Sequence, residues 1–218
     1  MRTRYLVVCL LLIAAACAAL VYCWPLLPEQ VPVHWNIEGQ VDGYAGRAVM
    51  WALGPGGMAL FTLVGLALPA LSPNRFGMTE FLPTYYYIAG LVVCMLGYVF
   101  ALLLIAGTGG EVSMQRALPA GLFLLLILMG NPLGKVRRNF YVGIRTPWTL
   151  ASERVWYATH RMAARLMVAS GLLGLLALWM HAPGWGILLL GLAWTPLVVL
   201  YSLLHYKKLQ KDHQLESH

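Results

Sequence analysis

The sequence predicts an all-α membrane protein, a polytopic bundle of about six transmembrane helices. Of its 218 residues, 60% are hydrophobic and only 11% are charged, and the mean hydropathy is +0.71. A soluble domain carries roughly 25% charged residues, so this chain cannot cover a globular surface with polar groups. Helices are expected because backbone N–H and C=O groups find no water partners in lipid.

Six apolar stretches come near the roughly 20 residues that a helix needs to cross about 30 Å of hydrocarbon. They are Tyr5–Trp24, Ala48–Leu71, Thr84–Gly107, Ala117–Gly134, Met162–Met180 and Gly184–His205. The fourth is short and contains Asn131-Pro132, which should break or kink the helix near its end. The fifth continues from a more polar segment, so hydropathy defines its start poorly.

The first stretch begins like a secretory signal, because Arg2 and Arg4 precede an apolar run. Within that run, Ala14-Ala15-Ala16-Cys17 faintly resembles a lipoprotein cleavage site. However, the run continues to Trp24, a length that suits a membrane span better than the apolar core of a signal peptide. We therefore expect this stretch to remain as the first transmembrane helix.

The lysines and arginines predict the orientation. With both termini in the cytoplasm (N-in/C-in), 13 of the 15 basic residues face the cytoplasm, the bias seen in membrane proteins. The cytoplasmic set is Arg2, Arg4, Arg75, Lys135, Arg137, Arg138, Arg145, Arg154, Arg161, Arg165, Lys207, Lys208 and Lys211, and the outer set is Arg47 and Arg116. The predicted partner of these charges is the lipid bilayer, with no direct contact to nucleic acid.

This topology divides the chain into two halves of three spans each. Residues 1–110 form the first half, with an extracytoplasmic loop over residues 25–47. Residues 111–218 form the second half, with a basic cytoplasmic loop over residues 134–161. The two loops, on opposite sides of the membrane, are the candidate functional segments.

The outer loop is predicted to fold as a small extracytoplasmic cap between the first two helices. Pro28 and Pro32 block a helix and favour extended backbone. Val31, Val33 and Trp35 alternate with more polar neighbours, as on a short strand. Glycines after this segment supply turns, so we expect a hairpin.

Aromatic and polar side chains in this loop suggest recognition of an external ligand, because exposed loops often carry binding residues. The predicted ligand-binding residues are His34, Trp35, Asn36, Asp42 and Tyr44. His34, Glu38 and Asp42 also suggest a metal site, since their spacing of four residues would place them on one helix face. The surrounding glycines and prolines disfavour that helix, so we predict no metal site and expect His34 and Asp42 to hold turns together.

The basic inner loop leads into a predicted amphipathic helix. Thr149 is the expected N-cap, and Glu153 lies in the first turn, near the positive end of the helix dipole. One face carries Trp156, Thr159, Ala163 and Leu166, and the other carries Arg154, Arg161 and Arg165.

This loop is either a simple orienting anchor or a docking surface for a cytoplasmic partner. Its density of Gly, Asn, Pro and Trp favours docking, because an anchor needs no special backbone. The predicted docking residues are Asn131, Asn139, Arg145, Thr146, Trp148, Thr149, Trp156, His160 and Arg161.

Two motifs in these loops resemble the SdpI family, named for the membrane immunity protein of the sporulation-delaying toxin system. The outer motif is Leu27-Pro28, Val31-Pro32-Val33-His34-Trp35-Asn36, Gly39 and Asp42-Gly43-Tyr44, similar to the family's N-terminal domain of unknown function. The inner motif is Gly130-Asn131, Asn139-Phe140, Gly143-Ile144-Arg145-Thr146-Pro147-Trp148-Thr149-Leu150 and Trp156 with Thr159-His160-Arg161. With the six spans, the resemblance covers nearly the whole chain.

The resemblance implies a multi-pass protein of the bacterial cytoplasmic (inner) membrane that protects against a secreted peptide toxin or another envelope-active peptide. It also implies signalling, in which a cytoplasmic transcriptional repressor is held at the membrane. The family supplies no catalytic residues, and HExxH and GxSxG are absent from the sequence, so we predict no enzyme, no catalytic residue and no cofactor.

A small-solute or lipid transporter or channel of the inner membrane is the alternative function. Coupled transporters usually carry ionisable groups inside the bundle. The cores of the six stretches, away from their ends, hold no Asp, Glu, Lys or Arg. Ion-coupled transport is therefore disfavoured, whereas a pore lined by Ser, Thr, Asn and backbone remains open.

Overall fold

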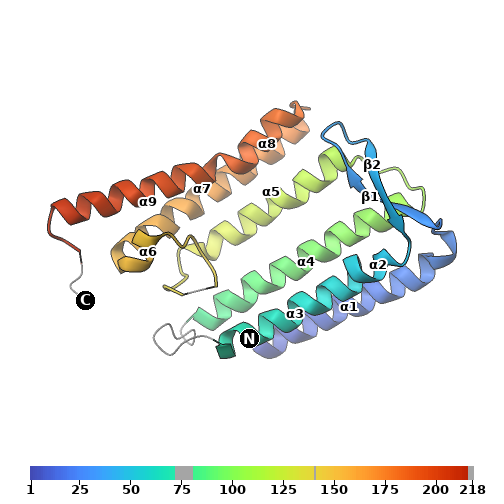
Figure 1. Cartoon of the computed structure of the whole chain (residues 1–218), viewed down its shortest axis with the longest axis horizontal. Helices are drawn as coiled ribbons and strands as arrows, with labels where there is room; N and C mark the ends of the chain where they lie inside the picture. Colours follow the sequence, from blue (N-terminus) through green and yellow to red (C-terminus); the bar gives the residue numbers. More distant parts are fainter. Residues whose placement is uncertain (72–80, 140, 216–218) are drawn as a thin grey trace. The chain divides into compact units, whose positions relative to one another are not determined.

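The computed structural model describes residues 1–71, 81–139 and 141–215 (Figure 1). Its helices are α1 (Arg2–Cys23), α2 (Val49–Trp51), α3 (Gly57–Ala67), α4 (Leu82–Gly107), α5 (Met114–Leu133), α6 (Pro147–Ala151), α7 (Glu153–Trp179), α8 (Gly184–Leu192) and α9 (Trp194–Lys211), and its strands are β1 (Gln30–Trp35) and β2 (Val41–Gly46). Arg75 and Phe140, used above for topology and for the inner motif, lie outside the described residues.

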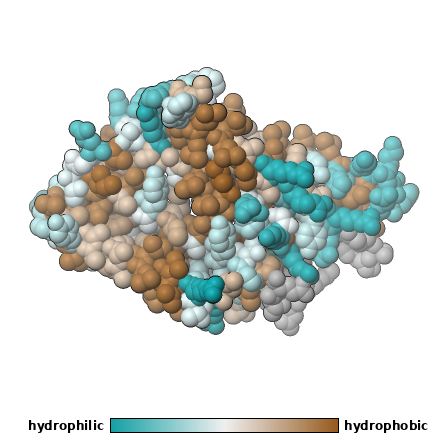
Figure 2. Space-filling model, turned by 180° about the vertical axis from the view of Figure 1, so that it is seen from behind, coloured by the Kyte–Doolittle hydropathy of each residue, from teal (hydrophilic) through white to brown (hydrophobic). Residues whose placement is uncertain are grey.

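Six helical segments of the described chain are long and apolar enough to cross a membrane, which confirms the predicted fold class. They are Arg2–Leu26, Val49–Leu71, Leu82–Gly107, Met114–Leu133, Glu153–Trp179 and Gly184–Lys211. Large apolar side chains such as Leu11 and Leu63 are exposed, and Figure 2 shows wide apolar areas on the surface. This surface suits hydrocarbon rather than water.

The structure consists of two compact units. The first comprises Met1–Ala67 and Tyr86–Leu122, and the second comprises Leu68–Tyr85 and Phe123–His218. The first unit carries the β-hairpin, and the second carries the segment between α5 and α7.

In the first unit, α1 packs closely against α3. The Tyr5 hydroxyl donates to the carbonyl of Thr62 at 3.2 Å, and its ring lies 5.2 Å from that of Tyr86. This approach depends on Gly65, because a Cβ there would overlap the Tyr5 hydroxyl. A short π-helical turn, Ala52–Gly56, joins α2 to α3 and accommodates Pro55 within the span.

The predicted hairpin is confirmed. Strands β1 and β2 pair antiparallel, with Val31 opposite Ala45 and Trp35 opposite Val41, and the register is irregular around His34. Asn36 closes the turn, since its side-chain oxygen accepts from the Gln40 N–H at 2.9 Å. The side of the membrane on which this hairpin lies stays a prediction.

In the second unit, α7 packs against both α8 and α9. Gly174 lets α7 approach Phe123, the first residue of α5 that belongs to this unit. A Cβ at Gly174 would overlap the aromatic ring of Phe123. The sixth span is two helices rather than one, with the break at Ala193. Pro196 lies just after this break and lacks the N–H that would continue the ladder from α8.

The start of the fifth span corrects one expectation. Thr149 is not the N-cap of the long helix. It lies inside the short helix α6, which Thr146 caps, and Ser152 caps α7 instead. Glu153 does lie in the first turn of α7, as predicted. Arg154, Arg161 and Arg165 are exposed, whereas Trp156, Thr159 and Ala163 are buried, which confirms the two-faced character of the helix.

The predicted topology can be tested with single cysteines at two exposed positions, Gln40 in the hairpin turn and Lys135 after α5. In a variant whose four natural cysteines are replaced by alanine, a membrane-impermeant maleimide added to intact spheroplasts should label Gln40→Cys. It should label Lys135→Cys only after permeabilisation, because the positive-inside bias places that segment in the cytoplasm. Labelling of both positions under the same conditions would refute the N-in arrangement.

Candidate functional site

The inner loop of the second unit is organised around the side chain of Asn139, which is fully buried. Its Oδ1 accepts from the backbone N–H groups of Tyr141 and Val142, each at 2.7 Å. Its Nδ2 donates to the carbonyls of Arg137 at 2.7 Å and Val142 at 3.0 Å. Both lone pairs and both N–H groups of the amide are therefore satisfied, so this side chain closes the turn.

His160 of α7 fixes the next part of the loop. Its Nδ1 lies 2.7 Å from the Trp156 carbonyl, and its Nε2 lies 3.0 Å from the N–H of Ile144. A carbonyl accepts only and an amide N–H donates only, so the imidazole is neutral, with its proton on Nδ1. Gly143 precedes Ile144 with φ +121°, and a Cβ at Gly143 would overlap His160 Nε2. Glycine is thus required both by conformation and by space.

Trp156 holds the start of the same loop. Its indole Nε1 donates to the carbonyl of Val136 at 2.7 Å, and its ring stacks on His160 with centroids 4.1 Å apart. Both side chains are fully buried. One stacked pair on α7 therefore binds the loop at two points, Val136 and Ile144.

Two threonines shape the turn into α6. Thr146 and Thr149 form a capping box in which each side chain accepts from the other's backbone N–H, at 3.3 Å and 2.9 Å. The Thr149 hydroxyl also contacts the Ile144 carbonyl at 2.9 Å. Beside them, the indole N–H of Trp148 donates to Ser202 and so ties α6 to α9.

The predicted docking residues separate into three groups by exposure. Asn139, Thr149, Trp156 and His160 are buried, Thr146 and Trp148 are half-buried, and Asn131, Arg145 and Arg161 are exposed. A partner can touch only the exposed and half-buried side chains directly. The four buried side chains make hydrogen bonds to the backbone of the loop and so fix its conformation.

Sequence reasoning missed three residues that hold this region together. Ser152 caps α7, with its hydroxyl accepting from the Val155 N–H at 3.3 Å. Arg138 donates to the Leu150 carbonyl at 2.9 Å. The hydroxyl oxygen of Ser202 accepts the hydrogen bond from the Trp148 indole N–H. Only Ser152 carried a sequence signal, because a serine directly before an acidic first turn is a typical N-cap.

In the first unit, the hairpin brings His34 and Asp42 together. Nδ1 of His34 lies 2.5 Å from Oδ1 of Asp42, which is the hydrogen-bonded pair predicted from the sequence. The two side chains are 71% and 45% exposed, so water screens the pair strongly. Among the residues that the structure describes, no three His, Cys, Asp or Glu side chains gather as metal ligands.

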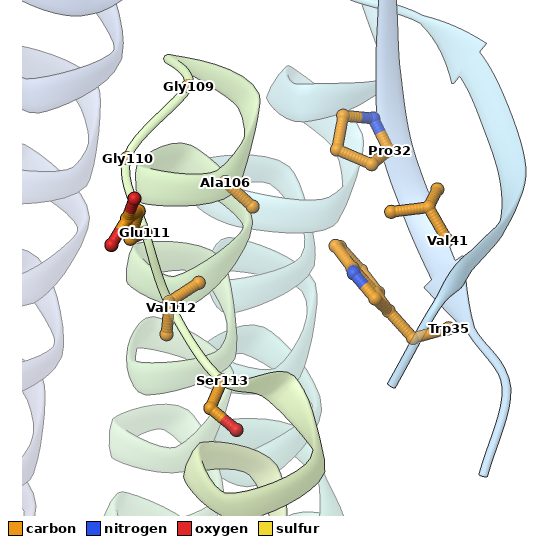
Figure 3. A pocket seen from close by; sticks show the side chains of 9 residues that line it. All are labelled: Pro32, Trp35, Val41, Ala106, Gly109, Gly110, Glu111, Val112 and Ser113. Atoms are coloured by element: carbon orange, nitrogen blue, oxygen red, sulfur yellow. The ribbon is translucent and has the colours of Figure 1, made fainter. Parts of the chain in front are cut away.

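Beside the hairpin, the first unit has an open groove of about 610 Å³ (Figure 3). Its lining residues are Pro32, Trp35, Val41, Ala106, Gly109, Gly110, Glu111, Val112 and Ser113. The indole of Trp35 extends into the space between the strands and the segment that follows α4. Among the predicted ligand-binding residues, Trp35 lines the groove, Asn36 shapes the adjacent turn, and His34, Asp42 and Tyr44 are exposed on the hairpin.

The far wall of this groove was not foreseen. Residues 109–113 follow α4, and the hairpin is joined to the start of α5 because Gln115 donates to the Ile37 carbonyl at 3.2 Å. The glycine pair at 109 and 110 indicated a turn in the sequence. Nothing in the sequence alone indicated that this turn would face the hairpin.

Within the described residues, six helical segments of membrane-spanning length and two structured interhelical segments define a multi-pass α-helical membrane protein. Residues 135–202 match the SdpI/YfhL protein family, and residues 11–59 match a domain of unknown function, DUF1648. These matches confirm the predicted resemblance to the SdpI family. The hydrogen-bonded inner loop, from Val136 to the Ser202 contact, lies within the first match.

A curated relative shows the same resemblance. The chain is 26% identical to Immunity protein SdpI of Bacillus subtilis (strain 168) over 145 residues. The alignment covers 66% of this chain and 67% of that protein. No solved structure matches the chain.

Proposed function

We propose that this chain is a membrane immunity protein of the bacterial cytoplasmic membrane that protects its cell against a secreted toxin or envelope-active peptide. The similarity to Immunity protein SdpI carries the proposal, because it extends over about two thirds of both proteins. The match to the SdpI/YfhL family over 135–202 agrees with it. A non-enzymatic role is consistent with that relative.

The hairpin and its groove are the proposed contact for the toxin. The groove combines the indole of Trp35 and other apolar side chains with glycine backbone at Gly109 and Gly110. Apolar side chains beside exposed glycine backbone are well suited to a peptide, because a peptide offers apolar side chains and polar backbone groups together. His34, Asp42 and Tyr44 lie exposed on the same hairpin and would contact the parts of a ligand outside the groove.

The inner loop is the proposed contact for a cytoplasmic regulator. Arg145 and Arg161 are exposed. The buried side chain of His160 holds the N–H of Ile144, directly before Arg145, and Arg161 is carried by α7 itself. Signalling requires that toxin binding favour one arrangement of this loop over another. A ligand can shift such an equilibrium only by its differential affinity for the two arrangements.

Protection should be measured in an indicator strain that lacks immunity genes and is challenged with the sporulation-delaying toxin. Cells expressing the chain should survive, and Trp35→Ala should lower the protective potency at least about ten-fold, as expected for a buried aromatic contact in a binding site. Trp185→Ala is the matched control, because Trp185 is exposed and does not line the groove.

Membrane insertion of each variant is verified by labelling at Gln40→Cys. Unchanged sensitivity of cells that carry correctly inserted wild-type protein would refute the immunity role. Equal protection by Trp35→Ala and wild type would remove the groove from the proposal.

A further inference from the structure

The ends of α7 and α9 bring cationic side chains together in the second unit. These helices pack against each other, and Arg154 in the first turn of α7 donates to the carbonyl of Gln214, just beyond the end of α9, at 3.2 Å. Arg161 follows Arg154 by about two turns, and His205 and Lys208 precede Gln214 by a similar length of chain, so the three side chains lie at the same level of the helix pair. Arg161 and Lys208 are exposed, and His205 is half-buried. The three residues are called the α7–α9 cluster below.

The imidazole of this cluster is held in place. Tyr201, one turn earlier on α9, stacks on His205 with ring centroids 5.7 Å apart and an interplanar angle of 5°. The neighbouring turn of α9 is fixed by the Trp148 hydrogen bond to Ser202. An imidazole in a fixed orientation can direct an N–H toward an acceptor.

The cluster is not neutralised from within the described chain. Ion pairs of the described residues join His34 to Asp42 and Arg138 to Glu153, and neither involves Arg161 or Lys208. Arg165 adds a further exposed positive charge one turn along α7. Like charges repel each other less when an anion lies between them, so the arrangement favours binding of an anionic group.

We propose that the α7–α9 cluster binds the phosphate of an anionic phospholipid headgroup. α7 and α9 belong to candidate membrane spans, and the cluster lies where both change from apolar to basic sequence, the level of the headgroups. Leu200 and Leu204 precede Lys208 at intervals of four residues on the same helix face, and both are exposed. The phosphate would contact the cluster while an acyl chain covers these leucines.

Native mass spectrometry of the full-length protein in neutral detergent, titrated with phosphatidylglycerol, tests this site. We expect one preferred adduct, weakened about five-fold by Arg161→Gln or by Lys208→Gln, as for one basic residue at an anionic membrane surface. Lys207→Gln is the matched control. Lys207 is exposed next to Lys208 but lies on the side of α9 away from His205, so its loss should change the affinity less than about two-fold.

Three results would overturn the proposal. An equal loss of affinity in the Lys207→Gln control would indicate diffuse attraction rather than a site. Equal binding of phosphatidylcholine would show that the negative headgroup is not recognised. Displacement of phosphatidylglycerol by millimolar inorganic phosphate would assign the cluster to a free anion. None of these measurements depends on toxin immunity, so the result is independent of the proposed function.

Discussion

Gly143→Ala is expected to unfold the inner loop while leaving the membrane helices in place. The backbone at Gly143 has φ +121°, a region that residues with a Cβ rarely adopt. The new methyl group would also overlap His160 Nε2, the acceptor for the Ile144 N–H. Strained backbone and overpacking each cost about 1–3 kcal/mol, so the folded loop should lose about 4 kcal/mol.

Gly109→Ala separates these two causes. Gly109 also has a positive φ, +81°, but no atom lies within 4 Å of the position that a Cβ would occupy. This control therefore carries the conformational cost alone, about 1–2 kcal/mol. Hydrogen–deuterium exchange measures the two effects, at residues 136–146 for Gly143→Ala and at residues 105–113 for Gly109→Ala. The amides of Tyr141, Val142 and Ile144 are protected by side chains of the loop network, and those of Gly109 and Gly110 by carbonyls of α4. Unchanged protection in Gly143→Ala would show that the loop tolerates the methyl group and that the described contact is wrong.

The fold was predictable because its determinants are local. A membrane span requires an uninterrupted apolar stretch, and the predicted stretch Thr84–Gly107 differs from α4 by only two residues at its start. The hairpin was predictable from the alternation around Val31 and Trp35, since side chains alternate between the two faces of a strand. Both patterns can be recognised without knowledge of distant contacts.

The site was less predictable because its roles depend on contacts distant in sequence. His160 was predicted as a docking residue, yet it is buried and accepts from Ile144, sixteen positions away. Thr149 was expected to cap the long helix, but its hydroxyl is committed to Ile144 and Thr146, so Ser152 caps α7. The density of Gly, Asn, Pro and Trp indicated that the inner loop has a defined backbone conformation. Only the structure shows which backbone groups the side chains of His160 and Thr149 hydrogen-bond.

The same distinction explains the break in the sixth span. By length and hydropathy, Gly184–Lys211 counts as one membrane span, although its helix breaks at Ala193. Hydropathy reports whether a segment is stable in lipid, and it says nothing about hydrogen bonds of single residues. Pro196 was visible in the sequence, but its effect on the helix is a matter of backbone geometry.

Asn139→Ala is expected to destabilise the inner loop by about 4 kcal/mol. The substitution leaves the N–H groups of Tyr141 and Val142 and the carbonyl of Arg137 without their partner. Each unsatisfied group in a buried environment costs about 1–3 kcal/mol, and the Asn139 side chain is fully buried. Asn139→Asp should not restore stability, because a carboxylate accepts from the two N–H groups but cannot donate to the carbonyls.

Asn36→Ala is the matched control, since Asn36 makes the same kind of turn in the hairpin. Its side chain bonds to the backbone and side chain of Gln40 at 2.9 Å and 3.2 Å, but at an exposed position. Water replaces those bonds, so the loss should stay near 1 kcal/mol. Exchange rates of residues 136–146 and 36–40 in the two variants provide the comparison. Similar losses at both turns would mean that burial does not set the strength of the Asn139 contacts, and the inner loop would then be an ordinary surface turn.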